Sequence, residues 1–283
     1  MILINIAYSM PVVKVGSLLN KPDRDLAASA VAKGEIVGIF NRGVCALWLD
    51  GGDLKAVKKI WKIKGEEREG RPIALTLDLE EFISMIDLDL LPAKLQNLIK
   101  SKDFNLQVGS LCFIRAPIKA HHQLSIPEHA KSFTSDGVCM IQNWDSFGHD
   151  STEEFLNEVK RRGVKHPAVT SMNITGQKEI VDQKKGEEFC KKYGIPIFLK
   201  DPKAHPGHIG SYTIFTFGRE GIKLDRDGNI PSRLFKKIFG LPIDTKGAKK
   251  PNYPQLKFPG SLFKNMSGAK VRQSVLIYLQ RGY

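Results

Sequence analysis

Hydroxyl and amide side chains gather in the segment HPAVTSMNITGQKEIVD, which runs from His166 to Asp182. Four of them lie within six residues: Thr170, Ser171, Asn173 and Thr175. They follow an apolar stretch typical of a strand, and hydroxyl and amide donors at a strand end suit the oxygens of a phosphate. The same residue types also form Asx and Ser/Thr turns that cap a following helix. The segment alone therefore fits two interpretations, a site for a polar ligand and a turn that caps a helix.

The charge of the chain also indicates an anionic partner. There are 43 Lys and Arg residues against 30 Asp and Glu, a formal net charge of +13. Such an excess favours a nucleic acid or a phosphate-rich small molecule as partner. Residues 245–283 contain no acidic residue and eight basic ones: Lys246, Lys249, Lys250, Lys257, Lys264, Lys270, Arg272 and Arg281. We therefore expect a main domain over 1–243 and a basic C-terminal extension over 244–283.

The composition narrows the class of protein. The 283 residues, 42% of them hydrophobic, suit one packed domain or a domain with a small appendage. No run of about 18 apolar residues occurs, so no membrane span is expected. The N-terminal stretch MILINIAYSMPVVKVGS lacks a basic leader and is interpreted as a strand rather than a signal peptide. The four cysteines (Cys45, Cys112, Cys139 and Cys190) form no CxxC pair, so free buried thiols in a reducing cytoplasm are expected.

Helices and strands are predicted to alternate along most of the chain. Periodicity and capping residues predict helices over 25–33, 54–64, 77–86, 91–101, 151–163, 177–194 and 231–240. Apolar runs predict strands over 35–40, 71–77, 108–117, 136–144, 164–171 and 195–201, and a hairpin over 210–228. Asp53 is the expected N-cap of the second helix, and Ser151 with Glu154 is expected to form a capping box. After residue 240 the pattern fades. These elements predict an α/β fold in which helices cover a mixed, twisted sheet.

The order of these segments resembles the YrdC-like family, whose members make threonylcarbamoyl-adenylate for a tRNA modification. GEIVGIFNRGVCALWLD stands where the family has its first core strand and a Pro-Thr-x-Thr turn, and IWKIKGEEREGRPIALTL resembles its Lys-x-Arg motif and the strand after it. VTSMNITGQ resembles its Thr-Ser-x-Asn-x-Ser-Gly loop, and GSYTIFTFGREGIKLDRDG resembles its Ser-Thr strand and closing Arg-x-Gly turn. The resemblance covers roughly Val12 to Leu241 and implies a YrdC/RibB-like twisted mixed sheet flanked by helices.

The resemblance also implies a set of site residues. Lys64 and Arg68 would neutralise phosphate or carboxylate charge. Ser171 and Asn173 would bond the phosphate and neighbouring groups of an adenylate, with Thr175 in place of the family's second Ser. Ser211, Thr213 and Arg226 would also hold the nucleotide. Arg226 is flanked by two Asp residues and could instead pair with them.

Three departures from the family pattern put the chemistry in question. Phe40 to Gly43 (FNRG) replaces the Pro-Thr-x-Thr turn, and both hydroxyls are lost. Glu66 stands at the Arg position of the Lys-x-Arg motif, and Arg68 or Arg71 could substitute from a longer loop. The loop KGEEREGR could also be a solvated charged loop. The segment CMIQNW fills the place of an Arg-x-Pro strand without an Arg.

Two histidine-containing loops do not have the spacing of a metal site. His121, His122 and His129 lie in one loop, and His205 and His208 lie in another, where they could contact an anion. Neither loop has the helical i, i+4 spacing or paired Cys of a zinc site. The chain also lacks the motifs of a dinucleotide fold, a P-loop and a GxSxG nucleophile elbow.

Three functions follow from the sequence. The first is an enzyme that converts ATP with Mg²⁺, bicarbonate and L-threonine to threonylcarbamoyl-adenylate and pyrophosphate. The second is a relative that binds double-stranded RNA or tRNA through basic residues and has no synthase activity. The third is a carbamoyl-transfer enzyme with another acceptor.

Overall fold

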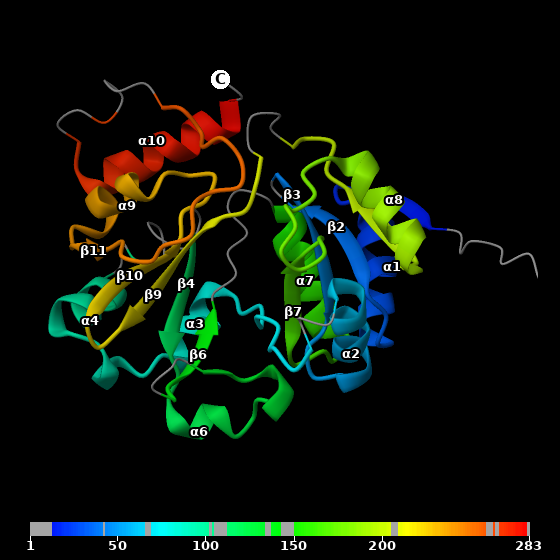
Figure 1. The fold of residues 1–283 in the computed structure, drawn as a ribbon, viewed down its shortest axis with the longest axis horizontal. Coiled ribbons are helices and arrows are strands. Elements are labelled where there is room, and N and C mark those ends of the chain that lie inside the picture. Colours follow the sequence, from blue (N-terminus) through cyan, green and yellow to red (C-terminus); the bar gives the residue numbers. More distant parts are fainter. Residues whose placement is uncertain are drawn as a thin grey trace, which may run out of the picture.

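The chain folds into two mixed β-sheets that lie side by side, each covered by helices (Figure 1). The computed structural model describes residues 13–41, 43–65, 69–101, 104, 112–133, 137–142, 150–204, 209–258, 263 and 266–281. Within these residues the first sheet has five strands, in the order β1 (Lys14–Ser17), β8 (Ile197–Lys200), β2 (Val37–Asn41), β3 (Val44–Asp50) and β7 (Pro167–Ser171). The second has six, in the order β11 (Ile243–Asp244), β10 (Gly221–Arg226), β9 (Thr213–Gly218), β4 (Cys112–Pro117), β6 (Cys139–Gln142) and β5 (Ser132–Phe133). The predicted α/β class is confirmed, with two sheets in place of the single sheet expected.

Helices cover both faces of the first sheet. One face packs against α1 (Lys21–Ala32) and α7 (Asp150–Arg161), where the rings of Trp48 and Phe155 meet edge to face at 5.3 Å. The other packs against α2 (Leu54–Lys64) and α8 (Gln183–Tyr193). Asp53 caps α2 as predicted, because its side chain accepts a hydrogen bond from the backbone of Lys55 at 2.8 Å. The helix ends at Lys64, next to residues 170–176 (the TSMNITG loop), where the carbonyl of Lys64 accepts from the backbone N–H of Thr175 at 2.9 Å.

Helix α8 approaches strands β2 and β3 closely at two glycines, Gly38 on β2 and Gly186 on α8. A Cβ atom at Gly186 would lie 2.5 Å from the sulfur of Cys45, and one at Gly38 would lie 2.6 Å from that of Cys190. Neither distance is compatible with a side chain, so both positions require glycine unless the backbone moves. This contact fixes α8 and the extended segment that leads into it from the TSMNITG loop.

One face of the second sheet is covered and the other is open. The covered face packs on α3 (Leu79–Met85), α4 (Ala93–Lys100), α9 (Ser232–Phe239) and α10 (Gly268–Arg281). The ring of Phe215 lies 5.0 Å from that of Phe235 and 5.1 Å from that of Phe239, measured between centroids. Alternate residues of β4 and β9 point the other way and line the cavities described below. Within the described residues, the other short helices are α6 (Ala120–Gln123) and the 3₁₀ turns η2 (Leu88–Leu90) and η3 (Glu128–Ala130).

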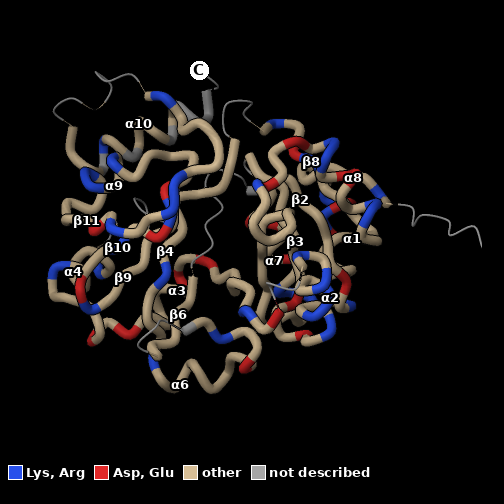
Figure 2. Tube along the Cα trace, in the orientation of Figure 1, with Lys and Arg blue, Asp and Glu red and all other residues tan. Residues whose placement is uncertain are grey.

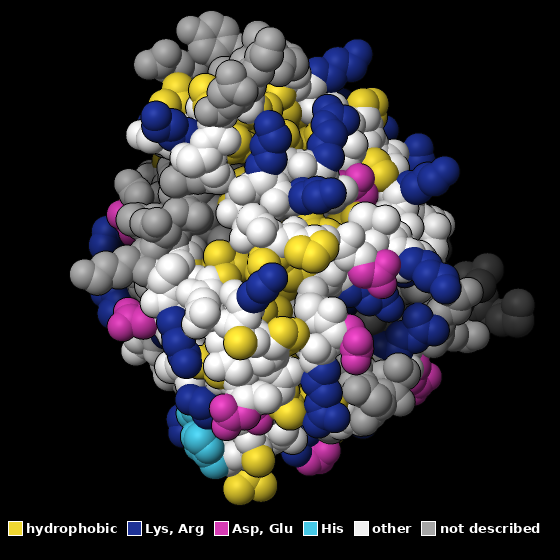
Figure 3. Space-filling view, turned by 90° about the vertical axis from the view of Figure 1, so that its left-hand side faces the viewer, with side chains coloured by type: hydrophobic (Ala, Val, Ile, Leu, Met, Phe, Trp, Pro, Cys, Tyr) yellow, Lys and Arg dark blue, Asp and Glu magenta, His cyan; other side chains and the backbone are white. Residues whose placement is uncertain are grey.

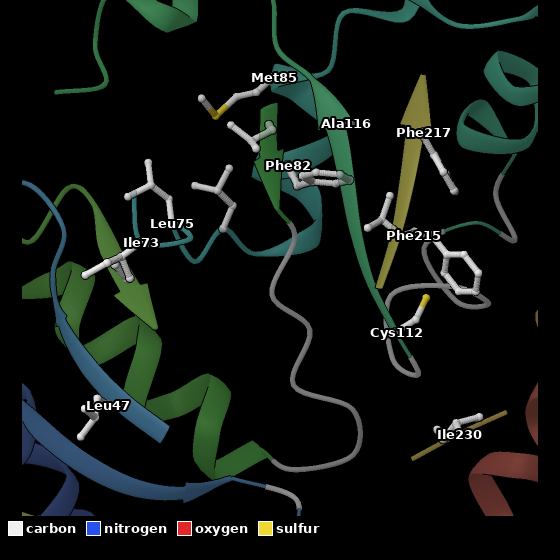
Figure 4. Packing of buried hydrophobic residues seen from close by; sticks show 14 of the residues in the cluster. Leu47, Ile73, Leu75, Phe82, Met85, Cys112, Ala116, Phe215, Phe217 and Ile230 are labelled. Atoms are coloured by element: carbon white, nitrogen blue, oxygen red, sulfur yellow. The ribbon is translucent and has the colours of Figure 1, made fainter. Parts of the chain in front are cut away.

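One of the two hydrophobic cores joins the two sheets, and the other lies between the first sheet and helices α1 and α7. Leu47 lies in the first sheet, Phe215 and Phe217 lie in the second, and Ile73 and Leu75 lie on the segment between them (Figure 4). The strand expected over 71–77 is reduced to isolated bridge residues, Leu75, which pairs with Ala168, and Leu77. Because the core is continuous, the walls of any cavity between the sheets are held in one packed unit.

Helix α10 was not predicted from the sequence, because Pro, Gly and Lys residues dominate the chain before it. Val271 and Val275 are completely buried within the same core as α9. A Cβ atom at Gly268 would lie 2.5 Å from the carbonyl oxygen of Lys237, so α10 begins directly against the end of α9. Part of the basic C-terminal segment is therefore packed against the second sheet.

Two further predictions of helix starts are wrong. The helix expected over 177–194 begins at Gln183, where Asp182 is the N-cap. In the segment before it, the backbone N–H of Ile180 donates to the carbonyl of Met172, and the carbonyl of Ile180 accepts from the backbone N–H of Cys45. Tertiary pairing thus overrides the helical preference of QKEIVD. Ser151 is also not an N-cap, because α7 already includes Asp150.

Three other expectations concern the cysteines, membrane-spanning helices and the N-terminal strand. All four cysteines are buried and unpaired, as predicted, and burial raises the pKa of Cys190 to about 12. None of the described helices is long and apolar enough to cross a membrane. Of the N-terminal strand expected from MILINIAYSMPVVKVGS, residues 1–12 fall outside the described residues, and its end is confirmed by β1 (Lys14–Ser17).

Candidate functional site

A cavity of about 750 Å³ lies between the two sheets. Strands β2, β3 and β7 and the segment 70–75 form its wall on the side of the first sheet. Strands β4, β6 and β9 and residues 130–132 form the wall on the side of the second sheet. The volume lies within the range of about 300–1,000 Å³ that is usual for small-molecule sites. The cavity is therefore the principal candidate for a ligand site in the described part of the chain.

Most of the charged residues that line this cavity are basic. Arg71, Arg115, Lys131 and Arg226 line it, and Glu128 is the one carboxylate in the described lining. Lys131 forms a salt bridge with Glu128, so these two charges offset each other. Arg115 lies 3.5 Å from the carboxylate of Asp225. The remaining positive charge favours an anionic ligand.

Arg226 is a partly buried cation at the edge of the cavity. Its Nε and Nη2 atoms donate to the carbonyl oxygen of Tyr212 at 3.2 and 2.9 Å. Burial lowers the pKa of its guanidinium to about 10, while the charge of Glu179 opposes that shift. The group stays charged at neutral pH. Asp225 and Asp227 do not pair with it, since Asp225 contacts Arg115 and Thr216, and Asp227 accepts from the backbone of Ser232. The interpretation that Arg226 pairs with its flanking acids is wrong.

The TSMNITG loop is held from below by Lys64. The ammonium group of Lys64 is buried and donates to the carbonyl oxygens of Ser171 and Asn173 at 2.6 and 3.1 Å, and to Asn173 Oδ1 at 3.0 Å. The Ser171 hydroxyl also donates to Asn173 Oδ1, at 2.7 Å. The Asn173 amide donates to the carbonyls of Ile174 and Gln177 at 3.1 and 2.7 Å. Lys64 and Asn173 do not line the cavity, so in this structure they form the turn whose outer residue, Ser171, faces the cavity.

The other residues expected in the site take different positions. Ser211 lines the cavity, and its backbone N–H donates to Glu179 at 3.1 Å. Thr213 is completely buried behind it, where its hydroxyl donates to the carbonyl of Ile230 at 2.5 Å and accepts from the backbone of Gly228 at 3.0 Å. The Thr175 hydroxyl is buried outside the lining, with no hydrogen-bond partner in the described structure. The structure thus brings Ser171, Ser211 and Arg226 together at the cavity.

Several residues that could take part in chemistry lie elsewhere. Arg68 and Glu66, together with His205 and His208, fall outside the described residues. His129 contacts the carbonyl oxygen of Gly51 at 2.8 Å, and the rings of His121 and His122 lie 4.0 Å apart. The described residues contain no group of three or more His, Cys, Asp or Glu arranged to hold a metal ion.

Arg115 is a site residue that the sequence analysis missed. It is paired in register with Gln142, and its Nε donates to Gln142 Oε1 at 3.2 Å. Strand β6 carries Gln142 in the segment CMIQNW, which lacks an arginine, and the neighbouring strand β4 supplies a guanidinium beside it. The alternation of Phe113, Arg115 and Pro117 along β4 was the available signal, because it places all three on one face.

A second cavity of about 760 Å³ adjoins the first on the open face of the second sheet. The two cavities share Arg115, Ser132 and Met140 in their linings. Asp225 lies between Arg115 and Thr216 and accepts from the Thr216 hydroxyl at 2.6 Å. The side chain of Arg115 is therefore held at the boundary between the two cavities.

Residues of the C-terminal extension fasten the two loops that carry the serines. Glu179 is buried, and one carboxylate oxygen accepts from Ser211 while the other accepts from the Asn252 amide at 2.5 Å. The Tyr253 hydroxyl donates to the carbonyl of Glu179 at 2.5 Å. Burial of Glu179 opposes its ionisation, but the hydrogen bonds from Asn252 and Ser211 outweigh burial and lower its pKa. The ionised carboxylate joins the TSMNITG side of the site to the Ser211 side.

Replacing Asn252 by leucine should make the protein more sensitive to acid. The ionised form of Glu179 stabilises the fold above its unfolded pKa, near 4.5, and that stability is lost as pH falls through the lower folded value. Loss of the Asn252 donor raises the folded pKa, so acid unfolding should begin at a higher pH, and stability at neutral pH should fall by about 1 kcal/mol. Circular dichroism across an acid titration measures both. In a Glu179→Gln background, the Asn252 substitution should no longer change the pH at which acid unfolding begins. If Asn252→Leu alone left that pH unchanged, the result would contradict this role of Glu179.

Comparison with known proteins supports the architecture at the level of the fold. No protein-family profile matches the chain, and no curated protein matches it in sequence. A double-alanine variant of P. abyssi Sua5 superimposes with a TM-score of 0.61 at 15% identity, over 87% of this chain and 68% of Sua5. Sua5 in complex with L-threonine gives 0.59 at 16% identity over the same shares of the two chains. E. coli YciO gives 0.55 at 14% identity, over 77% of this chain and 96% of YciO.

The chain has the YrdC-like fold. A phosphate- and nucleotide-bound structure of full-length HypF also contains a similar region, with a TM-score of 0.51 at 16% identity over 73% of this chain and 29% of HypF. The YrdC-like fold predicted from the order of the sequence segments is therefore confirmed. Identities of this size establish the shared fold, and the activity is argued from the site.

Proposed function

We propose that this protein binds ATP in the cavity between the sheets and uses bicarbonate and L-threonine to form threonylcarbamoyl-adenylate and pyrophosphate. The observation that carries the proposal is the cavity itself, which is of nucleotide size and is lined by Arg71, Arg115 and Arg226 together with three serines, Ser171 and Ser211 among them. The fold adds support, because similar structures include Sua5 complexed with L-threonine and HypF in a nucleotide-bound form. The product would serve a tRNA modification.

The proposed reaction needs charge neutralisation more than acid–base catalysis. The amino group of L-threonine and bicarbonate would form a carbamate with loss of water, and a carbamate oxygen would attack the α-phosphorus of ATP and displace pyrophosphate. The two steps bring several oxyanions into one place, which arginine side chains can hold bidentately. In this chain Arg71, Arg115 and Arg226 are positioned for that task, whereas Lys64 binds the loop. Ser171 and Ser211 would donate to ligand oxygens.

Mg²⁺ would come to this site with the nucleotide. Glu128 is the one carboxylate in the described lining, and it is paired with Lys131. Mg²⁺ is commonly held by few protein oxygens together with the phosphates of a substrate. The residues present thus fit an ion bound mainly to triphosphate oxygens, where it would reduce the negative charge that the arginines must balance.

A pyrophosphate-release assay tests the proposed reaction. Wild-type protein with ATP, Mg²⁺ and bicarbonate should release pyrophosphate only when L-threonine is added. A Ser171→Ala/Asn173→Ala variant should lose most of that activity, because it lacks one hydroxyl at the cavity and the amide that shapes the loop. A Ser84→Ala variant is the control, since Ser84 is exposed on α3 and its hydroxyl bonds a carbonyl of its own helix. Amino-acid-independent release, or none at all, would contradict the proposal. Release with another amine in place of L-threonine would indicate a different acceptor.

A second candidate function is binding of double-stranded RNA or tRNA without synthase activity. The observation that favours it is the internal bonding of the TSMNITG loop, where Lys64 and Asn173 already satisfy one another. Lys and Arg residues are spread over both halves of the molecule (Figure 2). They are also frequent on the upper part of the face shown in Figure 3.

The dependence of binding on salt separates the two candidates. Binding to a phosphate backbone weakens steeply as salt rises, and binding in a pocket changes less. RNA gel shifts at low and high salt, beside the ATP titration described below, measure both. Tight, salt-sensitive RNA binding without ATP binding would favour the second function.

A further inference from the structure

Asn41 is a buried polar residue whose side-chain oxygen has no hydrogen-bond partner in the described structure. Asn41 is the last residue of strand β2, is 2% exposed, and lines the cavity between the sheets. A buried carbonyl oxygen without a donor is costly, and such groups in folded proteins usually have a specific reason to be retained. Thr76, Thr152 and Asn229 also have buried oxygens without partners, but they do not line this cavity.

The backbone around Asn41 is fixed, so the amide cannot easily turn away. Asn41 pairs with Val44 across the hairpin of β2 and β3. At the tip of the hairpin, the carbonyl oxygen of Gly43 accepts from the backbone N–H of Gly210 at 2.9 Å. This bond holds the hairpin against the turn that carries Ser211. The Asn41 oxygen is therefore presented from a rigid element, which is where a recognition group is most effective.

The chemistry of the lining indicates what this oxygen can receive. A carbonyl oxygen accepts hydrogen bonds, and the oxygens of fully ionised phosphate and carboxylate groups cannot donate to it. The described lining holds no unpaired carboxylate, because Glu128 is bonded to Lys131. A ligand amino group would therefore meet a neutral acceptor here and not a negative one.

We propose that Oδ1 of Asn41 accepts a hydrogen bond from the amino group of the amino-acid substrate. The inference rests on the proposed function and names the residue that selects and orients the amine. A neutral acceptor has a chemical advantage over a carboxylate in this position. An amine acts as a nucleophile only after losing its proton, and a carboxylate neighbour would favour the ammonium form. An amide orients the amine with little effect on its basicity.

Two substitutions at Asn41 test the assignment. Asn41→Leu removes the acceptor at similar size, so L-threonine affinity should fall at least tenfold while ATP affinity changes less than twofold. The melting temperature should rise, because a buried oxygen without a partner is removed. Asn41→Asp should bind L-threonine at least as tightly as the wild type, yet turn over more slowly at neutral pH and recover at higher pH. Isothermal titration, pyrophosphate release and thermal unfolding give these values.

Thr76→Val is the matched control, because it also removes a buried oxygen without a partner but lies outside the cavity lining. It should leave L-threonine affinity unchanged. A lower melting temperature for Asn41→Leu would overturn the inference, since it would show that the amide is satisfied within the fold. Loss of ATP affinity instead of L-threonine affinity would also overturn it and place the nucleotide at Asn41. Wild-type protein that binds ATP but not L-threonine would overturn this inference and leave nucleotide binding intact, and binding of neither would overturn both.

Discussion

Replacing Lys64 by methionine is expected to destabilise the protein by about 3 kcal/mol and to weaken ATP binding as a consequence. Methionine preserves most of the apolar stem but removes the ammonium group. The carbonyl oxygens of Ser171 and Asn173 and the side-chain oxygen of Asn173 would then lose a charged donor inside the fold. Chemical denaturation measures the change in the free energy of unfolding. The loop that presents Ser171 should loosen, so ATP affinity should fall about tenfold, which corresponds to about 1.4 kcal/mol.

The pattern of effects at Lys64 separates a positioning residue from a catalytic one. Lys62→Met is the control, since Lys62 is exposed on the same helix, and its stability should stay within about 0.5 kcal/mol of the wild type. If Lys64→Met left stability unchanged and abolished ligand binding, Lys64 would have to reach the ligand directly. That outcome would contradict the role assigned here.

Replacing Arg226 by methionine is expected to lower ATP affinity by about 10- to 100-fold, the range of a lost charge-assisted hydrogen bond. Arg226 is partly buried at the edge of the cavity, and its Nε and Nη2 atoms donate to a single carbonyl oxygen, that of Tyr212. The charge is thus held by the fold and faces the lining without a carboxylate bound to it in the described structure. Isothermal titration of ATP with Mg²⁺ measures the effect, and denaturation checks that the variant is folded.

Two further variants make the Arg226 result specific. Arg219→Met should bind ATP like the wild type, because Arg219 lies at the β9–β10 turn and lines only the second cavity. Arg226→Lys keeps a positive charge but cannot make the paired contact with Tyr212, so it should recover only part of the affinity. Equal losses in Arg219→Met and Arg226→Met would indicate a general charge effect and contradict a defined contact at Arg226.

The sequence predicted the elements better than the contacts. The order of helices and strands, the α2 N-cap at Asp53 and the β9–β10 hairpin are confirmed, because each depends on local periodicity or capping chemistry. Helix α10 was missed because its stability comes from Val271 and Val275 packing beside α9, which is a tertiary effect. The late start of α8 has the same origin, since Ile180 pairs with Met172 and Cys45.

In the candidate site, too, the contacts of individual side chains could not be predicted from the sequence. Ser171, Ser211 and Arg226 line the cavity, and their contact with a nucleotide stays a prediction. Lys64, Asn173 and Thr213 bond to the protein around the cavity. Residue type alone cannot tell a group that faces a ligand from one that holds the loop beside it. Arg115 and Asn41 became visible only when strand register and burial were known. Arg68 remains a prediction, because it lies outside the described residues.

Titration of ATP with Mg²⁺ into the wild-type protein at low and high salt tests the central claim, that the cavity between the sheets is a nucleotide site. The account predicts saturable binding of one ATP per chain with micromolar affinity, and only a modest loss at high salt because the nucleotide is enclosed. Heat of binding that is absent at both salt concentrations, or that disappears at high salt, would contradict it.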